Sequence, residues 1–411
     1  MTSLKKISNK TVKQLNNSAI KQFNNKAIKQ FNNKAIQQYK HMKIITQISR
    51  VFVGVLFIIS GLIKANDTIG FSYKLEEYFE VFHMPIFIPY AVAMAMFICI
   101  FEIISGVALL LGAFNKLNAW LLLLMIVFFT LLTGYSAITH KVTDCGCFGD
   151  AIKLKPVESF YKDLILLVLI LFIFFGQKHL KPLMKFTLQN IALSVAFLVV
   201  TFFTFYTYMF LPVKDFLPYK VGNNIPDKMV CPPGSPVDSV VMMFIYEKNG
   251  VKEEFDVNHI PNDTNYKFVD RIDKVVREGC KPPIHDFSLT NTDGLNYTDS
   301  LFANKGYKLV LVQKSITEGR KGLEKQIALL ADDCKKDGKE FWALTATSAE
   351  TLEAYRHQNQ LAFNYYTVDA VPLKSMVRSN PGLMLMKGGV VIKKWSAYNF
   401  PTYDIVMRYM Q

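Results

Sequence analysis

The chain has 411 residues, of which 51% are hydrophobic and only 19% are charged, and its mean hydropathy is +0.20. This composition excludes a disordered chain, and the length predicts two or three folding units. Six cysteines in such a length exclude a small disulfide-stapled scaffold. The net charge is +14, but residues 1–41 hold nine lysines and no Asp, Glu or Arg, which leaves +5 for the remainder. Because the basicity belongs to a tail, no nucleic-acid partner is expected.

The N-terminal tail carries a tandem repeat of eight residues. From Lys13 the sequence reads KQLNNSAI, KQFNNKAI, KQFNNKAI. A period of eight matches no helical stripe, and each unit contains Asn-Asn. We interpret residues 1–41 as a disordered basic leader. One origin for this leader is translation of repetitive upstream DNA, in which case Met42 is the true initiator. A weakly amphipathic segment on anionic lipid is the alternative.

Five apolar segments are long enough to predict membrane spans, so membrane lipid is an expected partner. No cleaved signal peptide is expected, because the first segment lacks a small-residue cleavage site and further spans follow. The predicted fold class is an α-helical transmembrane bundle of four spans plus one, followed by an α/β soluble domain. The predicted spans cover residues 44–63 and about 88–112, 119–138, 161–176 and 187–211.

The lysines between the spans predict the orientation. The fourth loop holds Lys178, Lys181 and Lys185 and no acidic residue, whereas Lys64 is assigned to a loop on the other side. We therefore expect a multi-pass protein of the cell inner membrane, with a cytoplasmic N-terminus and a periplasmic C-terminal domain. Because two spans follow the loop at 139–160, that loop faces the same side as everything after residue 211.

Two cysteines follow the third span in the segment DCGCFGD, residues 144–150. Gly146 permits the bend that a disulfide between Cys145 and Cys147 requires, and a strained small ring is easily reduced and hence a good oxidant. We predict that these two residues are catalytic in thiol redox exchange. A zinc site with His140, for which no fourth ligand is evident, and a tight turn with idle thiols are the alternatives. No metal is expected.

Two charged residues in the first two spans are candidate intramembrane polar sites. Glu102 lies well inside the second span, where an ionisable residue is functional or paired. Helical rise places Glu102 about 15 Å and Arg50 about 9 Å from the cytoplasmic edge, so we predict a salt bridge between them. Asp67 and the acidic residues at 76–80 are predicted to lie on a solvated loop.

The membrane part resembles known families at two places. In the first two spans the pattern Arg50…Gly54…Phe57…Ser60-Gly61-Leu62-Ile63-Lys64 and Glu102…Gly106…Leu109…Gly112 resembles the DoxX family. The CGCFGD loop is similar to that of MauE, the methylamine-utilisation membrane protein of the same superfamily. The resemblance covers residues 42–176 and implies a role in disulfide formation in an exported partner. It carries that role to Cys145 and Cys147, and it does not imply that this chain handles methylamine.

The C-terminal half predicts two further segments. Residues 187–211 form the fifth span, and residues 212–282 a linker with an insertion. That insertion is predicted as a β-hairpin over 240–257, turning at Asn249-Gly250, and a helix over 263–278. In residues 283–411 the alternation of strands and helices predicts an α/β sheet. Its expected elements are strands at 307–313, 340–346 and 363–368, helices at 320–336, 348–358 and 370–378, and two final strands hinged at Gly388-Gly389.

Residues 283–411 resemble a thioredoxin-like, TlpA-type domain. The resemblance rests on the PPIHDFSLTNTDG entry, the Pro381 loop and Trp395, and it implies a cis peptide bond at Pro381. That family places Cys-x-x-Cys between its first core strand and helix, but here residues 314–320 read KSITEGR. We therefore predict a docking module. Whether Cys231 and Cys280 pair is left open.

These features predict a membrane redox component that assists disulfide formation in an exported client, and hence a candidate thiol–disulfide oxidoreductase. The client's thiols are the expected partner, and a quinone is the candidate electron acceptor. The alternative is a non-catalytic membrane-anchored scaffold or recognition protein for an envelope complex.

Overall fold

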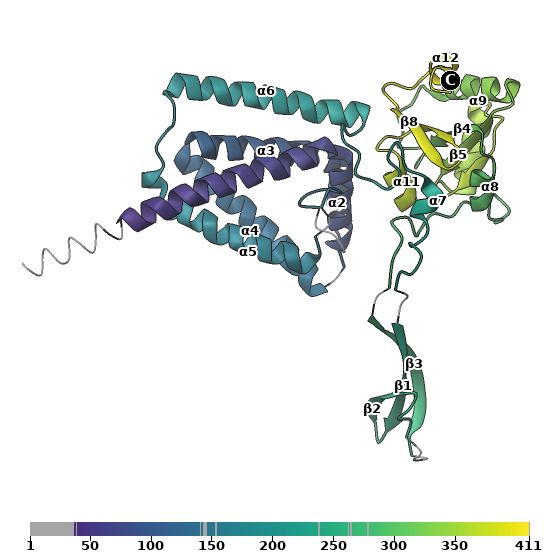
Figure 1. Cartoon of the computed structure of the whole chain (residues 1–411), viewed down its shortest axis with the longest axis horizontal. Helices are drawn as coiled ribbons and strands as arrows, with labels where there is room; N and C mark the ends of the chain where they lie inside the picture. Colours follow the sequence, from purple (N-terminus) through teal and green to yellow (C-terminus); the bar gives the residue numbers. More distant parts are fainter. Residues whose placement is uncertain are drawn as a thin grey trace, which may run out of the picture. The chain divides into compact units, whose positions relative to one another are not determined.

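The computed structural model divides into two compact units, Met1–Tyr208 and Met209–Gln411 (Figure 1). The repeat leader up to residue 36 lies outside the described residues, as do His140, Asp144 and Cys145. The described residues are 37, 39–139, 141–142, 146–152, 154–236, 239–261, 263, 265–277 and 279–410.

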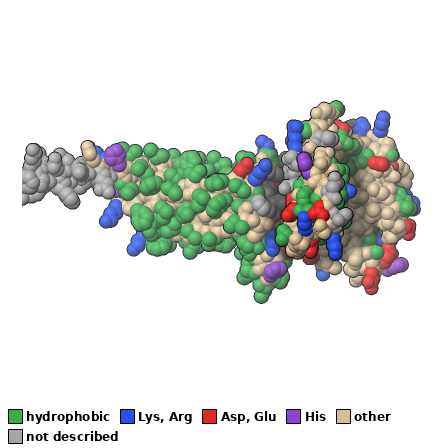
Figure 2. Space-filling view, turned by 90° about the horizontal axis from the view of Figure 1, so that it is seen from below, with side chains coloured by type: hydrophobic (Ala, Val, Ile, Leu, Met, Phe, Trp, Pro, Cys, Tyr) green, Lys and Arg blue, Asp and Glu red, His purple; other side chains and the backbone are tan. Residues whose placement is uncertain are grey.

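The first unit is helical, and the chain is a multi-pass membrane protein. Four of its helices are long and apolar enough to cross a bilayer, and hydrophobic side chains cover the face seen in Figure 2. The predicted fourth span corresponds to α5, whose status as a span stays a prediction because its first half holds Glu158, Lys162 and Asp163. The four apolar helices of the described residues are Tyr39–Asn66 (here the first helix), Pro85–Leu111, α4 (Asn115–Thr139) and α6 (Phe186–Phe210). The second of these joins η1 (Pro85–Tyr90) to α3 (Ala91–Leu111). The remaining helices are α2 (Thr68–Val81), α5 (Pro156–Phe175) and η2 (Gln177–His179).

Residues 68–81 form a helix, α2, so the prediction of a solvated loop there was wrong. Asp67 begins the helix as its N-cap, because its side chain accepts a hydrogen bond from the Gly70 amide at 2.8 Å. Phe71, Leu75 and Phe79 bury one face of α2 in a core shared with α3. The acidic residues marked the exposed face of an amphipathic helix.

The first helix and α3 approach each other closely through glycines. A Cβ added at Gly106 would lie 2.8 Å from the carbonyl oxygen of Gly54 and 2.9 Å from Cγ1 of Ile58. At Gly61 it would lie 2.5 Å from Cγ1 of Ile103. Small residues at helix crossings are typical of membrane bundles, where contact rather than the hydrophobic effect holds the helices together.

The second unit contains two sheets, of which the smaller is a three-stranded antiparallel arm in the order β2-β1-β3. Its strands are β1 (Ser239–Lys248), β2 (Val251–Asp256) and β3 (Lys267–Arg277). The predicted hairpin turn is confirmed, since Asn249 and Gly250 both have positive φ. The helix predicted over 263–278 was wrong, because the β-branched residues Val269 and Ile272 favour the strand that pairs with β1. A disulfide joins Cys231 to Cys280 beside the arm, with the Cα atoms 6.1 Å apart.

The larger sheet has the thioredoxin-like order β6-β5-β4-β7-β8. Strands β4, β5 and β6 are parallel, and β7 and β8 are antiparallel additions. The Asn380–Pro381 peptide bond, at the position predicted for a cis proline, is cis. The elements are α7 (Ile225–Lys228), α8 (Thr298–Ala303), β4 (Tyr307–Val312), α9 (Glu324–Lys336), β5 (Glu340–Thr345), α10 (Ala349–Asn359), β6 (Tyr365–Thr367), α11 (Ala370–Met376), β7 (Gly382–Lys387), β8 (Val390–Ser396) and α12 (Tyr403–Met407).

The central strand β4 is buried on both faces of this sheet. Leu309 and Leu311 enter the core that includes Ile327 of α9. Val310 and Val312 enter the opposite core. This arrangement explains why residues 309–312 read as a continuous apolar run, as is usual for a parallel strand between two helical layers.

The helix crossing generates a stability prediction. Gly106→Ala should destabilise the membrane unit by about 1–3 kcal/mol, because the new methyl group must displace the Gly54 backbone. The melting temperature of the detergent-solubilised protein measures this. Leu124→Ala is the control, since Leu124 is 72% exposed and should leave it unchanged. An equal melting temperature for Gly106→Ala and the parent chain would contradict the crossing.

Candidate functional site

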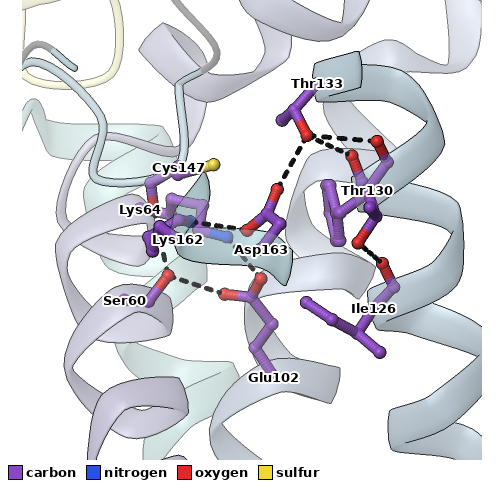
Figure 3. Close-up of polar contacts among 10 residues, drawn as sticks. Ser60, Lys64, Glu102, Ile126, Thr130, Thr133, Cys147, Lys162 and Asp163 are labelled. Carbon is purple, nitrogen blue, oxygen red and sulfur yellow. Dashed lines mark hydrogen bonds and ion pairs between the residues drawn. The ribbon is translucent and has the colours of Figure 1, made fainter. Parts of the chain in front are cut away.

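Cys147 lies in the loop between α4 and α5, above the polar end of the helical bundle. Residues 147–150 form a turn, and Gly146 has a φ of 66°, the left-handed conformation that glycine adopts at no steric cost. The hydroxyl of Ser60 in the first helix donates to the carbonyl oxygen of Cys147 at 2.9 Å. This bond holds the loop against the first helix (Figure 3). Cys145 lies outside the described residues, so its pairing with Cys147 stays a prediction.

A buried ion pair lies directly below this loop. The ammonium group of Lys64 contacts Oε1 of Glu102, and the two side chains are only 3% and 6% exposed. Ser60 Oγ lies 3.5 Å from Oε2 of the same carboxylate. The prediction that Glu102 pairs with Arg50 was wrong, and so was the assignment of Lys64 to a loop, because the first helix continues to Asn66.

Arg50 instead binds the end of α3. Its Nε donates to the carbonyl of Leu109 at 2.8 Å and its Nη2 to that of Leu110 at 2.6 Å. Nη1 reaches the carbonyl of Lys181 at 3.2 Å. The last carbonyls of a helix lack intrahelical partners, and the guanidinium supplies several donors to them. Arg50 is also about 21 Å of helical rise from Lys64, so the two ends of the bundle use separate cations.

A second ion pair, with a buried carboxylate and a partly exposed lysine, forms on α5. Lys162 Nζ lies 3.0 Å from Oδ1 of Asp163, whose side chain is 2% exposed. Thr133 of α4 donates to Oδ2 of Asp163 at 3.0 Å. The Lys162 ammonium also lies 5.3 Å from the ring centre of Phe148 and interacts with the side chain of Cys147. This lysine is therefore shared between a carboxylate, with which it forms the ion pair drawn in Figure 3, and a cysteine.

The two ion pairs and Cys147 line one small cavity of about 30 Å³, roughly the room for a single water molecule. The first helix supplies Ser60 and Lys64, α3 supplies Glu102, and α5 supplies the remaining pair. A cation beside a thiol favours the thiolate. The arrangement can therefore support a change of charge on sulfur without leaving an unpaired charge in a low-dielectric environment.

In the second unit, the segment that follows β4 is hydrogen-bonded to the loop before Pro381. The amide of Arg320 donates to the carbonyl oxygen of Asn380, next to Pro381, at 2.9 Å. The Asn380 side chain donates to the carbonyl of Ser315 at 2.7 Å. Cys334 of α9 is fully buried, and burial raises the pKa of its thiol to about 12. The Cys334 thiol is therefore unreactive, and residues 314–320, which pack beside Pro381, contain no cysteine.

A larger cavity, of about 550 Å³, lies among α3, α4 and α6. Its lining is mostly apolar, and the amide of Asn118 on its wall donates to the carbonyl oxygen of Ser105. A hydrocarbon chain fits such a lining. The described lining residues present no cluster of polar groups suited to a quinone head group, so we assign no electron-transfer step to this cavity.

The sequence analysis did not identify Ser60, Lys64, Lys162 or Asp163 as site residues, although it named Ser60 and Lys64 in a family pattern. Their signal was present, since charges at the ends of apolar helices are costly unless paired. The spacing of residues along the sequence did not show that three helices and the Cys147 loop converge on one cavity. Among the described residues no group of three His, Cys, Asp or Glu is placed to hold a metal. The zinc alternative involves His140 and Cys145, which lie outside that part of the chain.

Comparisons with known proteins agree with this division of the chain. Residues 42–176 match the family model of methylamine utilisation protein MauE, about a third of the chain. Residues 240–278, the three-stranded arm, match a model of a domain of unknown function, DUF8463. No curated protein matches. The solution structure of "a putative protein disulfide isomerase from Bacteroides thetaiotaomicron" is 15% identical, covering 30% of this chain and 82% of its own, with a TM-score of 0.25.

The ion pair below the loop predicts a double-mutant result. Lys64→Met and Glu102→Leu should each cost about 3–5 kcal/mol, because each leaves one buried charge without a partner. The double variant should recover most of that loss. Thermal unfolding in detergent measures all three. Lys74→Met is the control, since its pair with Glu77 is partly exposed and worth little. Additive losses in the double variant would contradict direct pairing.

The contact between Lys162 and Cys147 predicts a change in thiol reactivity. In the reduced protein, Lys162→Met should slow alkylation of Cys147 by iodoacetamide on the order of tenfold, because the thiolate loses its neighbouring cation. Lys162→Arg should retain most of the rate. Site-resolved mass spectrometry measures both. Equal rates in the methionine variant and the parent chain would show that the lysine does not act on this sulfur.

Proposed function

We propose that this chain is a membrane thiol–disulfide redox protein that transfers a disulfide to an exported client through Cys145 and Cys147. The observation that carries the proposal is the position of Lys162, whose ammonium contacts Cys147 at the mouth of a buried, charge-compensated cavity. A structural turn with idle thiols has no need of a shared cation. The MauE match over residues 42–176 supports a membrane redox role.

The proposed step is a thiol–disulfide exchange between two client thiols and the Cys145–Cys147 disulfide. A client thiolate attacks one sulfur of the Cys145–Cys147 disulfide and forms a mixed disulfide, and the other sulfur leaves as a thiolate. A second client thiolate then displaces the bound sulfur. Two electrons pass from the client to the pair, and the two protons lost by the client thiols neutralise the two new thiolates. The client becomes the disulfide and the pair the dithiol.

The lysine assigns different roles to the two cysteines. A sulfur that leaves beside a cation leaves faster, because its thiolate is stabilised. Lys162 contacts Cys147, so Cys147 is the leaving sulfur and Cys145 the one attacked. Reoxidation of the dithiol requires a two-electron acceptor, for which a membrane quinone is the candidate class.

Two observations support a shared side for the cysteines and the second unit. Thr207, near the end of α6, donates to the carbonyl oxygen of Ala65, so α6 ends beside the end of the first helix. The Cys147 loop is bound to that same end through Ser60, and the second unit begins at Met209. The Cys231–Cys280 disulfide suits an oxidising compartment. We therefore propose a periplasmic face of the inner membrane, with a cytoplasmic N-terminus.

A second candidate function is a non-catalytic scaffold for an envelope complex. It is favoured by the second unit, where residues 314–320 contain no cysteine and Arg320 closes against Asn380. Under the redox proposal this unit recognises the client and the membrane loop performs the exchange. Under the scaffold proposal the recognition is the whole function.

A trapping experiment tests the exchange and separates the two candidates. Cys147→Ser should accumulate a mixed disulfide between Cys145 and oxidised client, because the Cys145 thiolate can attack a client disulfide in the reverse of the proposed exchange, while Cys147 is no longer there to displace the bound client sulfur. Cys145→Ser should accumulate at least severalfold less. Cys334→Ser is the control, as that thiol is buried and inert. Non-reducing gels of membranes, after acid quenching and alkylation, measure the adducts. No adduct in either variant and no redox-dependent labelling of the pair would favour the scaffold.

A further inference from the structure

The outer edge of the three-stranded arm is an open strand. In the order β2-β1-β3, strand β3 pairs with β1 on one side, and no described strand covers its other side. Residues 267–273 are exposed, including Phe268 at 57% and Ile272 at 43%. An exposed edge of this length is a template for another strand unless its side chains prevent pairing.

The charges along β3 are symmetric about Ile272. The strand reads KFVDRIDKVVR from Lys267 to Arg277, so that Arg271 and Asp273 flank the central residue with opposite charges. The sequence continues the pattern with an aspartate at position 270 and a lysine at position 274. Such charges discourage pairing with an arbitrary strand, but an antiparallel copy of the same strand would place each charge opposite its complement.

We propose that β3 is a self-association edge, where two copies of this chain pair antiparallel about a two-fold axis through Ile272. In that register Arg271 of each copy lies opposite Asp273 of the other. The two arms then form one continuous six-stranded sheet with an isologous interface. The register of β3 against β1 shifts on both sides of residues 270–275, so regular pairing is confined to this central segment and leaves the like charges of Lys267 and Arg277 outside it.

The backbone of β3 fits this register. The Arg271 amide donates to Oδ1 of Asp270 at 2.7 Å, which indicates that it points away from β1 and toward the open edge. Residues alternate along a strand, so Asp273 presents its backbone groups to the same edge. Arg271 and Asp273 then form the hydrogen-bonded pairs across the axis. Ile272 faces its own copy in a non-hydrogen-bonded pair, where Cα atoms lie about 4.5 Å apart.

The same register completes an ion-pair ring. Within one chain, Nε and Nη2 of Arg271 already contact the carboxylate of Asp273 at 3.0 and 3.1 Å. Both side chains lie on one face of β3, since they are two residues apart. Pairing two copies brings two arginines and two aspartates together on that face in alternating order. Moving the axis by half a residue toward Arg271 would instead oppose Asp270 to Asp273, which is repulsive.

Membrane anchoring favours this contact. A single pair of edge strands is a small interface and gives weak association in dilute solution. Chains held in one bilayer meet at a higher effective concentration, which compensates for a small interface. The proposal does not depend on the redox role of Cys147.

Complementary charge variants test the proposal in the full chain, reconstituted in nanodiscs or liposomes. Arg271→Asp puts aspartates on both sides of the axis, and Asp273→Arg puts arginines there. Each variant alone should self-associate on the order of tenfold more weakly than the parent, because two attractive pairs become repulsive. An equal mixture of the two variants should restore association as a mixed dimer. Two-colour fluorescence transfer or differently tagged pull-down measures all of these pairings.

The mixed dimer separates pairing between chains from a structural role within one chain. Both variants break the internal Arg271–Asp273 contact, so an internal role predicts that the mixture associates no better than either variant alone. That outcome would overturn the proposal. So would self-association of either single variant at the parental level.

Cross-linking provides an independent measurement of the register. Ile272→Cys should form a disulfide-linked dimer under mild oxidation, because the distance across a non-hydrogen-bonded pair suits a disulfide. Glu254→Cys, on the exposed strand β2 at the other edge of the arm, is the matched control and should cross-link at least fivefold less. Equal cross-linking of the two variants would contradict pairing at β3.

Discussion

The membrane unit depends on one constraint: a charge placed inside an apolar helical bundle must find a partner there. Lys64 and Glu102 meet across two helices, and Lys162 meets Asp163 on a third. Arg50, at the other end, satisfies the carbonyls that end α3. These contacts, with the glycine crossing, determine which helices lie together. They also provide a polar surface beside the Cys147 loop, which Ser60 binds.

The same charges make the loop chemically distinct. A cysteine at the mouth of an apolar bundle would ordinarily favour its neutral thiol. Here Lys162 lies between Asp163 and Cys147, so a negative charge that forms on sulfur is met by a cation already present. Because the lysine is held by the carboxylate, it cannot turn away into lipid. The structural ion pair and the proposed redox chemistry therefore share one side chain.

Much of the fold followed from sequence periodicity, whereas the site did not. The apolar runs and the alternation after residue 283 located the long helices and the strands β4 to β8 to within a few residues. The errors have physical causes. Residues 263–278 carry apolar residues at helical spacing, but pairing with β1 prevailed. Arg50 and Glu102 looked like partners by helical rise, yet Lys64 lay closer, because the first helix continues past its apolar segment. Convergence of separate helices cannot be read from spacing along one chain.

In the second unit, the loop before the cis proline of the thioredoxin-like sheet is bonded to the chain's own groups. Here the Asn380 carbonyl is bound by the chain's own Arg320, and the Asn380 side chain binds Ser315. Backbone groups that are satisfied internally no longer attract an extended peptide, so any partner must bind this unit elsewhere. The open edge of β3 is such a place, since no described strand pairs with it and its side chains are ordered by charge. In the two proposals made for this chain, association therefore uses the inserted arm, whereas thiol exchange uses the loop of the membrane unit.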